Sequence, residues 1–411
     1  MQSIDLPDYV RGIMEQLEAS GNKAYLVGGC VRDIFLARRP SDWDICTGAL
    51  PEEVMKIFPE ALPIGLKHGT VTVIRDKKSV EVTTFRSDGR YEGHRRPESV
   101  TFIADLDQDL ARRDFTVNAM AADLSGHIFD PMGGRPDLSK KIIRCVGEPE
   151  ARFSEDALRM FRALRFSAQL GFFIHKDTMA GIRKQCSLAV YIAAERIRNE
   201  LGKIIMSDNP QCFNDVIYMG LLDKYLALPA GEAVADMDGI SSMDSIKTLP
   251  VNEAQRWSGI CAILESVKAI SSAGDFLKSL RLPQRIIRPV SRGVCLALSE
   301  PPSTALEWKR ALAGFGIETC LCAAAGICAV NGTEYAAAAG TLNSVYASGE
   351  CVSLKELAVS GRDIAGLGIS GAGVGTALQM LLDYVLVHPE CNRRDCLLDL
   401  AVSKMVFDSL S

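Results

Sequence analysis

Residues 25–47, YLVGGCVRDIFLARRPSDWDICT, are the stretch that decides the fold of this chain. A short apolar strand is expected to run into Gly28-Gly29, and a helix is expected to begin at Cys30. Free N–H groups at a helix N-terminus attract anions, and glycine lets the backbone approach a phosphate closely. Arg32 lies in the first turn of that helix, where it can bind a phosphate oxygen. A Gly-Gly pair alone is more often a tight turn, so the interpretation depends on its neighbours.

Two carboxylates follow the expected helix. Asp42 and Asp44 lead into the expected strand 44–47, and residues two apart on a strand face the same side. Their charges repel unless a cation lies between them. A third acid, Glu81, lies in the expected strand 80–85, and three acids on neighbouring strands suit Mg²⁺. Two such ions about 4 Å apart catalyse in-line phosphoryl transfer. The alternatives are a solvated loop for Asp42 and Asp44 and a paired residue at a strand edge for Glu81.

The expected elements change in kind near residue 150. Before it, short β-rich runs alternate with helical runs, and after it apolar residues recur at helical spacing. A helix with Ser154 as its N-cap is expected over 154–171. The order favours an α+β fold, with a small mixed sheet and helices followed by an all-helical region. The other expected strands are 24–27, 70–74 and 99–103, and the other expected helices cover 191–206, 253–270, 304–330 and 375–387.

The composition excludes several classes of protein. With 411 residues and 47% hydrophobic side chains, the chain can bury several cores, which argues against intrinsic disorder. Its net charge of −5 excludes a uniformly basic nucleic-acid coat but leaves a local basic patch open. The longest apolar run, 320–330, is far too short to span a membrane. Thirteen cysteines without a CxxC pair, and no export signal, predict a cytoplasmic protein with free thiols and argue against structural zinc.

The stretch SEDALRMFRALRF (154–166) combines charge with helical spacing. Asp156, Arg159, Arg162 and Arg165 are spaced by three and therefore follow one side of a helix. Asp accepts from an exocyclic amine and Arg donates to ring acceptors, so together they can select C or A and reject U and G. The alternative is an ordinary surface ion pair, worth about 0.2–0.5 kcal/mol. Residues 151–206 hold ten Lys/Arg and five Asp/Glu, which indicates an RNA-facing surface or a solvated helical face.

The sequence GGCVRD (28–33) followed by DWD (42–44) resembles the signature of class II nucleotidyltransferases, the DNA-polymerase-β-like superfamily. Over residues 20–205, and loosely in the tail, the chain resembles the bacterial CCA-adding enzymes, tRNA nucleotidyltransferases related to bacterial poly(A) polymerases. The resemblance implies Asp42, Asp44 and Glu81 as catalytic residues, with Asp42 and Asp44 as the Mg²⁺ ligands. It implies a nucleotide site made by Gly28, Gly29, Arg32, Arg113, Asp114, Asn118, Asp156, Arg159, Arg162 and Arg165.

The resemblance also implies roles for individual motifs. In the family, the motif at 110–121 contacts the sugar and triphosphate, and the EDxxR motif at 155–159 is an amino-acid template for CTP and ATP. Arg162 and Arg165 would face the triphosphate or the primer. The stretch 85–100, with Gly89, Gly93, Arg86, Arg90, Arg95 and Arg96, occupies the position of a flexible loop associated with the final A addition.

The resemblance predicts a catalytic head (1–140), a neck (141–206), a body (207–345) and a tRNA-binding tail (346–411). The expected function is addition of C, C and A to the 3′ end of tRNA from CTP and ATP. The alternatives are an A-adding enzyme or a poly(A) polymerase, a non-catalytic RNA-binding protein with a decayed head, and a nicotinamide oxidoreductase. The last depends only on GLGISG (366–371), which follows an expected helix where a dinucleotide site needs a strand.

Overall fold

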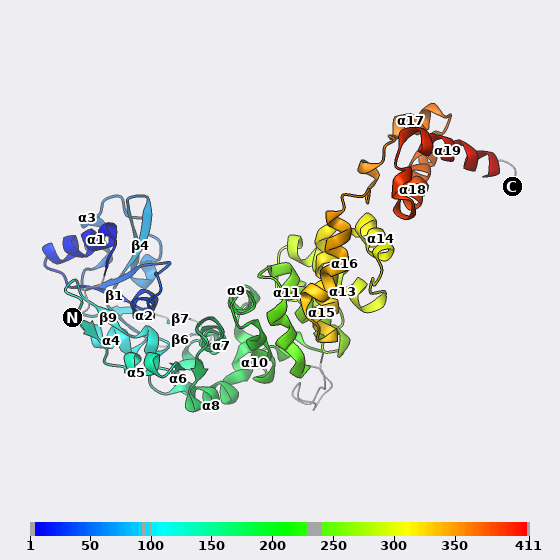
Figure 1. The fold of residues 1–411 in the computed structure, drawn as a ribbon. Helices are drawn as coiled ribbons and strands as arrows, with labels where there is room; N and C mark the ends of the chain where they lie inside the picture. The colour runs from blue at the N-terminus through cyan, green and yellow to red at the C-terminus, as the bar shows by residue number, and fades with distance from the viewer. Residues whose placement is uncertain (1–4, 90, 93–95, 98–99, 228–239, 409–411) are drawn as a thin grey trace. The chain divides into compact units, whose positions relative to one another are not determined.

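The computed structural model describes residues 5–89, 91–92, 96–97, 100–227 and 240–408 (Figure 1). The chain divides into two compact units, Met1–Lys224 and Tyr225–Ser411. The boundary between the units falls inside the predicted body, and the division into head, neck, body and tail stays a prediction. Across the described ranges, none of the helices has the length and apolar character needed to cross a membrane.

A six-stranded mixed sheet forms the centre of the N-terminal half of the first unit, with strand order β10-β9-β1-β2-β4-β3 (Figure 1). The predicted strands at 24–27, 44–47, 70–74 and 80–85 are confirmed. β2 and β4 are parallel, and their register places Asp44 beside Glu81. Val80 and Val82 are buried while Glu81 is exposed, because successive side chains of β4 point to opposite faces of the sheet. The strands are β1 (Ala24–Val27), β2 (Asp44–Thr47), β3 (Thr70–Arg75), β4 (Lys78–Thr84), β9 (Ala121–Ala122) and β10 (Ile128–Phe129).

Short helices accompany this sheet. α1 (Asp8–Ala19) buries an apolar face that includes Ile13 and Leu17. α2 begins at Gly29, one residue before the predicted start, because Gly28 adopts a φ of 76° and ends β1 in a turn that favours glycine. The other helices of this half are α3 (Pro51–Ile57), α4 (Leu106–Ala111) and α5 (Gly134–Ser139).

The stretch 85–100 contains short strands where a glycine-hinged loop was predicted. β5 (Arg86–Asp88) pairs with β8 (Val100–Phe102), and β6 (Tyr91–Glu92) pairs with β7 (Arg96–Pro97). The predicted strand 99–103 is confirmed as β8. Arg90, Gly93 and Arg95, which belong to the predicted loop, lie outside the described residues.

The single helix predicted over 154–171 is wrong. Two helices cover this region, α6 (Pro149–Glu155) and α7 (Leu158–Leu170), and Ser154 lies near the end of α6 and caps no helix. Pro149 starts α6, because proline favours the first helical position. The chain then becomes extended at Asp156, whose Oδ1 accepts a hydrogen bond of 3.1 Å from the backbone N–H of Leu158. An aspartate that bonds the backbone in this way competes with a continuous helix.

Helices and one small ladder complete the first unit. α7 ends at Leu170, directly before the predicted terminator Gly171, and it packs on α9 (Ala194–Ile205), which covers most of the predicted helix 191–206. Tyr191 lies at the end of a preceding 3₁₀ turn instead. The remaining elements are α8 (Lys176–Gln185), α10 (Phe213–Tyr218) and the parallel pair β11 (Ile142–Ile143) and β12 (Phe173–Ile174).

Helices account for the regular structure in the described part of the second unit. The pattern over 304–330 predicts continuous helix, but the structure has two helices, α14 and α15, which meet at Gly316 with a φ of 77°. Cys320 and Cys322 are buried thiols in α15. The helices are α11 (Glu253–Ser266), α12 (Ala273–Ser279), α13 (Gln284–Ser299), α14 (Ala305–Phe315), α15 (Ile317–Asn331), α16 (Tyr335–Ala347), α17 (Gly361–Gly366), α18 (Ala372–Val387) and α19 (Arg394–Asp408).

The glycine motif at 366–371 connects two helices of the second unit. It begins at the last residue of α17 and ends at Gly371, which precedes α18. A dinucleotide-binding turn needs a strand before the glycines, and here a helix precedes them. The structure therefore removes the observation on which the oxidoreductase alternative depended.

Candidate active site

A cleft of about 480 Å³ in the first unit gathers twelve of the thirteen predicted site residues. The residue left out is Glu81, which neighbours Asp44 through the register of β2 and β4. Two further residues line the cleft, Arg112 and Phe166. The predicted residues in it are Gly28, Gly29, Arg32, Asp42, Asp44, Arg113, Asp114, Asn118, Asp156, Arg159, Arg162 and Arg165.

The turn at Gly28 leaves little room for a side chain, and its φ of 76° favours glycine. A Cβ at this position would lie 3.2 Å from Nη1 of Arg113 and 3.8 Å from Oδ2 of Asp44. Arg32, in α2, donates from Nη1 to Oδ1 of Asn118 at 2.7 Å and from Nε to Oδ1 of Asp33 at 2.9 Å. The turn therefore brings backbone, guanidinium and carboxylate groups close together, which suits a triphosphate and its counter-ions.

Asp44 lies among other carboxylates of the cleft and is largely buried. Burial and the nearby charges of Glu81 and Asp42 raise its pKa to about 6, against the opposing effect of Arg113. A carboxylate in this environment is stabilised by a cation, so the chemistry of the donor set fits a metal. Asp42 is exposed, and its Oδ2 accepts from the Ser41 hydroxyl at 3.0 Å.

The protein alone offers too few ligands for a closed metal site. Among the described residues, no three His, Cys, Asp or Glu side chains gather into one metal-binding cluster. Mg²⁺ is usually held by one or two carboxylates together with substrate phosphates and water. Asp42 and Asp44 fit that arrangement. Glu81 is exposed on the neighbouring strand and lies beside Asp44 in the register of β2 and β4.

Arg113 is held by an acid that the sequence analysis missed. Its Nη2 contacts Oδ2 of Asp109 at 3.2 Å, and Nη2 of Arg112 contacts Oδ1 of the same carboxylate at 2.7 Å. Burial opposes ionisation of Asp109, but the two guanidinium groups outweigh it and lower its pKa. Asp109 lies four residues before Arg113, a spacing that places two side chains on the same face of a helix. That spacing could have identified the pair from the sequence.

Asp114 connects the motif at 110–121 to α7. Its Oδ2 accepts from Nε of Arg162 at 2.8 Å, and its Oδ1 accepts from Nδ2 of Asn118 at 3.2 Å. Burial opposes ionisation of Asp114, yet the Arg162 guanidinium and these hydrogen bonds lower its pKa to about 2. A permanently charged pair thus holds α7 against the residues that follow α4.

The charged residues of α7 and of the turn before it have specific partners, which the interpretation as a solvated helical face did not predict. Nη2 of Arg196, in α9, contacts Oδ2 of Asp156 at 3.0 Å. Nη1 of Arg159 contacts Oε2 of Glu155 at 2.6 Å, and the Arg159 residue is only 8% exposed. The sequence analysis missed Arg196, and it included Glu155 in the EDxxR motif without giving it a role. Glu155 is adjacent to Asp156 in sequence, whereas nothing in the local pattern points to Arg196.

Arg165 forms the most buried ion pair of the cleft. Its Nε lies 2.5 Å from Oε2 of Glu200 in α9, and both side chains are 8% exposed. Phe166 packs against the guanidinium groups of three arginines, with its ring centroid 3.9 Å from Cζ of Arg165 and 5.3 Å from those of Arg32 and Arg162. Each cation–π contact contributes about 0.5–2 kcal/mol, which offsets part of the repulsion between the three guanidinium groups.

Replacing Glu200 by glutamine is expected to destabilise the first unit by about 3–5 kcal/mol, because it leaves the buried Arg165 charge without its counter-ion. Urea unfolding measures the loss. Lys184→Gln is the control, since its pair with Glu150 is exposed and contributes little. Equal unfolding midpoints for the two variants would show that Glu200 does not compensate Arg165.

A second cleft of about 610 Å³ adjoins the first. It shares Asp42, Asp44 and Arg32 with that cleft and adds three exposed cations. Phosphates of a nucleic-acid strand would meet complementary charge there, directly beside the paired acids. The added cations are Arg38, Arg39 and Lys203.

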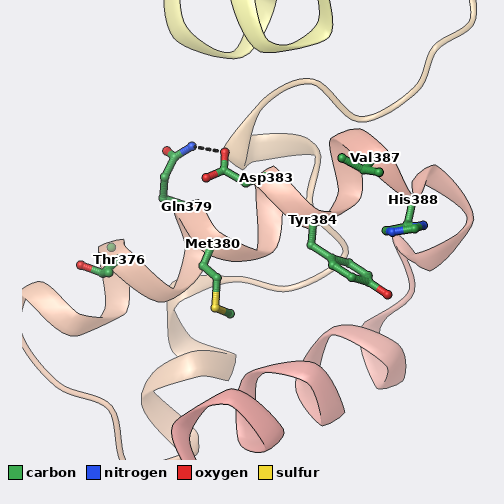
Figure 2. A pocket seen from close by; sticks show the side chains of 8 residues that line it. Thr376, Gln379, Met380, Asp383, Tyr384, Val387 and His388 are labelled. Carbon is green, nitrogen blue, oxygen red and sulfur yellow. Dashed lines mark hydrogen bonds between the residues drawn. The ribbon is translucent and has the colours of Figure 1, made fainter. Parts of the chain in front are cut away.

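A further cleft of about 730 Å³ lies in the second unit along α18 (Figure 2). Gln379 donates to Asp383 at 3.1 Å, and Tyr384 lies beside His388 with ring centroids 4.6 Å apart. This cleft has a single carboxylate and no arginine among its lining residues. It therefore lacks both the paired acids and the phosphate-binding groups that the first cleft combines.

Comparisons with known proteins show which family and which solved structures this chain is similar to. Residues 24–144 match the family model "Poly A polymerase head domain", and residues 171–230 match "Probable RNA and SrmB-binding site of polymerase A". The CCA-adding enzyme of Geobacillus sp. (strain WCH70) is 38% identical over 381 residues, which cover 92% of each chain. The crystal structure of Bacillus stearothermophilus CCA-adding enzyme in complex with CTP superposes with a TM-score of 0.80, at 33% identity and 98% coverage of both chains. Thermotoga maritima CCA-adding enzyme complexed with tRNA CCA shares the fold, with a TM-score of 0.66 at 19% identity and coverage of 98% of this chain and 97% of that one.

Proposed function

The chain belongs to the family of bacterial CCA-adding enzymes, and from that premise we propose that the cleft bounded by Gly28, Asp44 and α7 is its catalytic centre. The protein is a tRNA nucleotidyltransferase that adds C, C and A to the 3′ end of tRNA from CTP and ATP. The observation that carries the catalytic assignment is the convergence of twelve predicted site residues in one cleft.

We propose that Asp42 and Asp44 hold Mg²⁺, with Glu81 as a neighbouring charge. When bound, the metal supplies positive charge at the reacting phosphate and at the attacking hydroxyl. The turn at Gly28 and Gly29 lets the triphosphate approach the backbone, and Arg32 and Arg113 donate hydrogen bonds to its oxygens.

Asp156 and Arg159 read the base in this proposal. The Asp156 carboxylate accepts from the exocyclic amine that C and A share, and Arg159 donates to a ring acceptor. Arg162 donates to Asp114, which also accepts from Asn118, and in this proposal Arg162 faces the triphosphate or the primer. Arg165 and the adjoining cleft with Arg38, Arg39 and Lys203 are placed to hold the 3′ end of the RNA.

The reaction is proposed to take place in the cytoplasm, which fits thirteen cysteines that are all free thiols. The four predicted parts (1–140, 141–206, 207–345 and 346–411) remain our proposal for the roles of head, neck, body and tail.

The function is tested by incubating the protein with tRNA that lacks CCA, together with CTP and ATP. The expected product is three nucleotides longer and ends in CCA. A product that lengthens without limit in ATP alone would indicate a poly(A) polymerase. A tRNA that is bound but never extended would support the non-catalytic RNA-binding protein.

Shortening residues 88–95 is expected to leave an enzyme that adds CC and then stalls. The stretch follows β4, which carries Glu81, so it can adjust the cleft when the larger base of ATP replaces that of CTP. Product length on tRNA lacking CCA, with both nucleotides present, measures the effect. Normal completion of CCA would mean that the stretch is a passive connector, and equal loss of C and A addition would mean that it supports folding or primer binding.

A further inference from the structure

Two half-buried thiols lie at the turn that precedes α19 in the second unit. Cys391 is the last residue of the 3₁₀ turn Pro389–Cys391, and Cys396 is the third residue of α19. Eight of the thirteen cysteines are buried, so a reagent in the solvent can reach only a few of the thiols. The accessible thiols are Cys186, Cys212, Cys295, Cys391 and Cys396.

The fold of this turn brings the two thiols together. The side chain of a helical residue leans toward the N-terminus of its helix, so Cys396 points back toward the turn that carries Cys391. The backbone N–H of Arg393 donates to the carbonyl oxygen of Cys391 at 2.7 Å, which keeps the connection short. The two thiols interact through a side-chain hydrogen bond. Their side chains therefore point toward each other, as a disulfide requires.

The residues between the two thiols are anchored to the segment that contains α17. Oδ1 of Asn392 accepts from the backbone N–H of Ala358 at 2.8 Å, and Nδ2 of Asn392 donates to the carbonyl oxygen of Glu356 at 3.0 Å. Nη2 of Arg394 contacts Oδ1 of Asp363, in α17, at 2.7 Å. These contacts hold the turn in place, so the two thiols keep their relative position.

The two thiols differ in their surroundings. Partial burial and then the hydrogen bond with Cys396 raise the pKa of Cys391, against the opposing hydrogen bond with Tyr384 of α18 (Figure 2). Cys391 therefore keeps a proton that it can donate to a Cys396 thiolate. Cys396 lies in the first turn of α19, where the helix dipole stabilises negative charge and favours the thiolate. The turn thus pairs a thiol suited to attack with a protonated neighbour.

We propose that Cys391 and Cys396 form a dithiol that a hydroperoxide oxidises reversibly to a disulfide. The Cys396 thiolate attacks one peroxide oxygen, the O–O bond breaks, and the departing hydroxide takes up the proton that Cys396 released. The sulfur of Cys391 then attacks the sulfenic acid at Cys396, the S–O bond breaks, and the Cys391 proton leaves with the hydroxyl as water. Two thiols and one hydrogen peroxide thus give one disulfide and two waters, with sulfur oxidised and peroxide oxygen reduced.

The test treats the reduced full chain with hydrogen peroxide and then blocks the remaining thiols with iodoacetamide. Mass spectrometry of the peptide that contains Cys391 and Cys396 should show the loss of two hydrogen atoms and no label. Dithiothreitol should restore both thiols, because a disulfide is reducible. Cys295→Ser is the control, since Cys295 is an exposed thiol of α13 and its removal should leave the disulfide unchanged. The thermal unfolding midpoint checks that each variant is folded.

Single substitutions separate the roles of the two thiols. In Cys391→Ser the sulfenic acid at Cys396 has no partner, so it should gain a second oxygen and become a sulfinic acid that dithiothreitol does not reduce. In Cys396→Ser the thiol at Cys391 should be oxidised about tenfold more slowly than Cys396 is in Cys391→Ser. Separate iodoacetamide labels on both thiols of the treated wild type would overturn the proposal. So would disulfides that join two copies of the chain and disappear on dilution.

Discussion

Replacing Asp44 by asparagine abolishes nucleotide addition, with an expected loss of roughly 10³-fold or more in kcat/KM, while the tRNA dissociation constant stays within about twofold. The variant keeps the shape of the side chain and removes the charge that a metal requires. Arg113 retains its contact with Asp109, so the cleft keeps its arrangement without the Asp44 charge. Single-turnover incorporation of labelled CTP into tRNA lacking CCA measures the rate, and a filter-binding assay measures the affinity.

Glu52→Gln is the control for this variant. Glu52 is an exposed acid of α3 in the same unit, and it lines neither cleft near Asp44. Its loss should leave the rate unchanged. More than about a tenth of wild-type activity in Asp44→Asn would contradict the assignment of Asp44 as a metal ligand, because a ligand carboxylate cannot be replaced by an amide at so small a cost.

Replacing Asp156 by alanine reduces discrimination against UTP and GTP by roughly 10²-fold or more, while triphosphate binding changes less. The Asp156 carboxylate accepts from the backbone N–H of Leu158 and from both terminal nitrogens of Arg196. Two carboxylate oxygens offer about four acceptor positions, so one remains for the amine of C or A. Without that acceptor, the amine no longer distinguishes the correct bases. The measurement is kcat/KM for each of the four nucleotides.

Asp177→Ala is the control, because Asp177 is an exposed acid at the start of α8. Arg196→Met should reduce selectivity in the same direction as Asp156→Ala, since Arg196 orients the carboxylate. Full selectivity in Asp156→Ala, together with a lower unfolding midpoint, would mean that Asp156 only starts α7 and that the template assignment is wrong.

The sequence predicts local elements well where a single signal dominates. The strands around Asp44 and Glu81 were predicted because short β-rich runs are bounded by glycine and aspartate. Their parallel register was not predictable, since it arises from the packing of the sheet and not from either strand alone. The register is what turns two separate acids into neighbours.

The ion-pair partners of the charged residues in α7 could not be predicted from the sequence. One continuous helix was predicted over 154–171, with Asp156, Arg159, Arg162 and Arg165 along one side of it. The local bond from Asp156 to the backbone of Leu158 interrupts that helix, and Glu200 buries Arg165. Arg196 and Glu200 lie 40 and 35 residues beyond the groups they contact, so tertiary packing and not spacing decides these pairs.

The most direct test of the function measures which nucleotide the protein adds to each of three tRNAs, ending before CC, after the first C and after CC. Each tRNA is incubated with one labelled nucleotide at a time. Incorporation of CTP into the first two and of ATP into the third, with little UTP or GTP in any, is the expected result. Incorporation of ATP into the third tRNA alone would identify an A-adding enzyme and contradict the assignment of one cleft that selects C, C and then A.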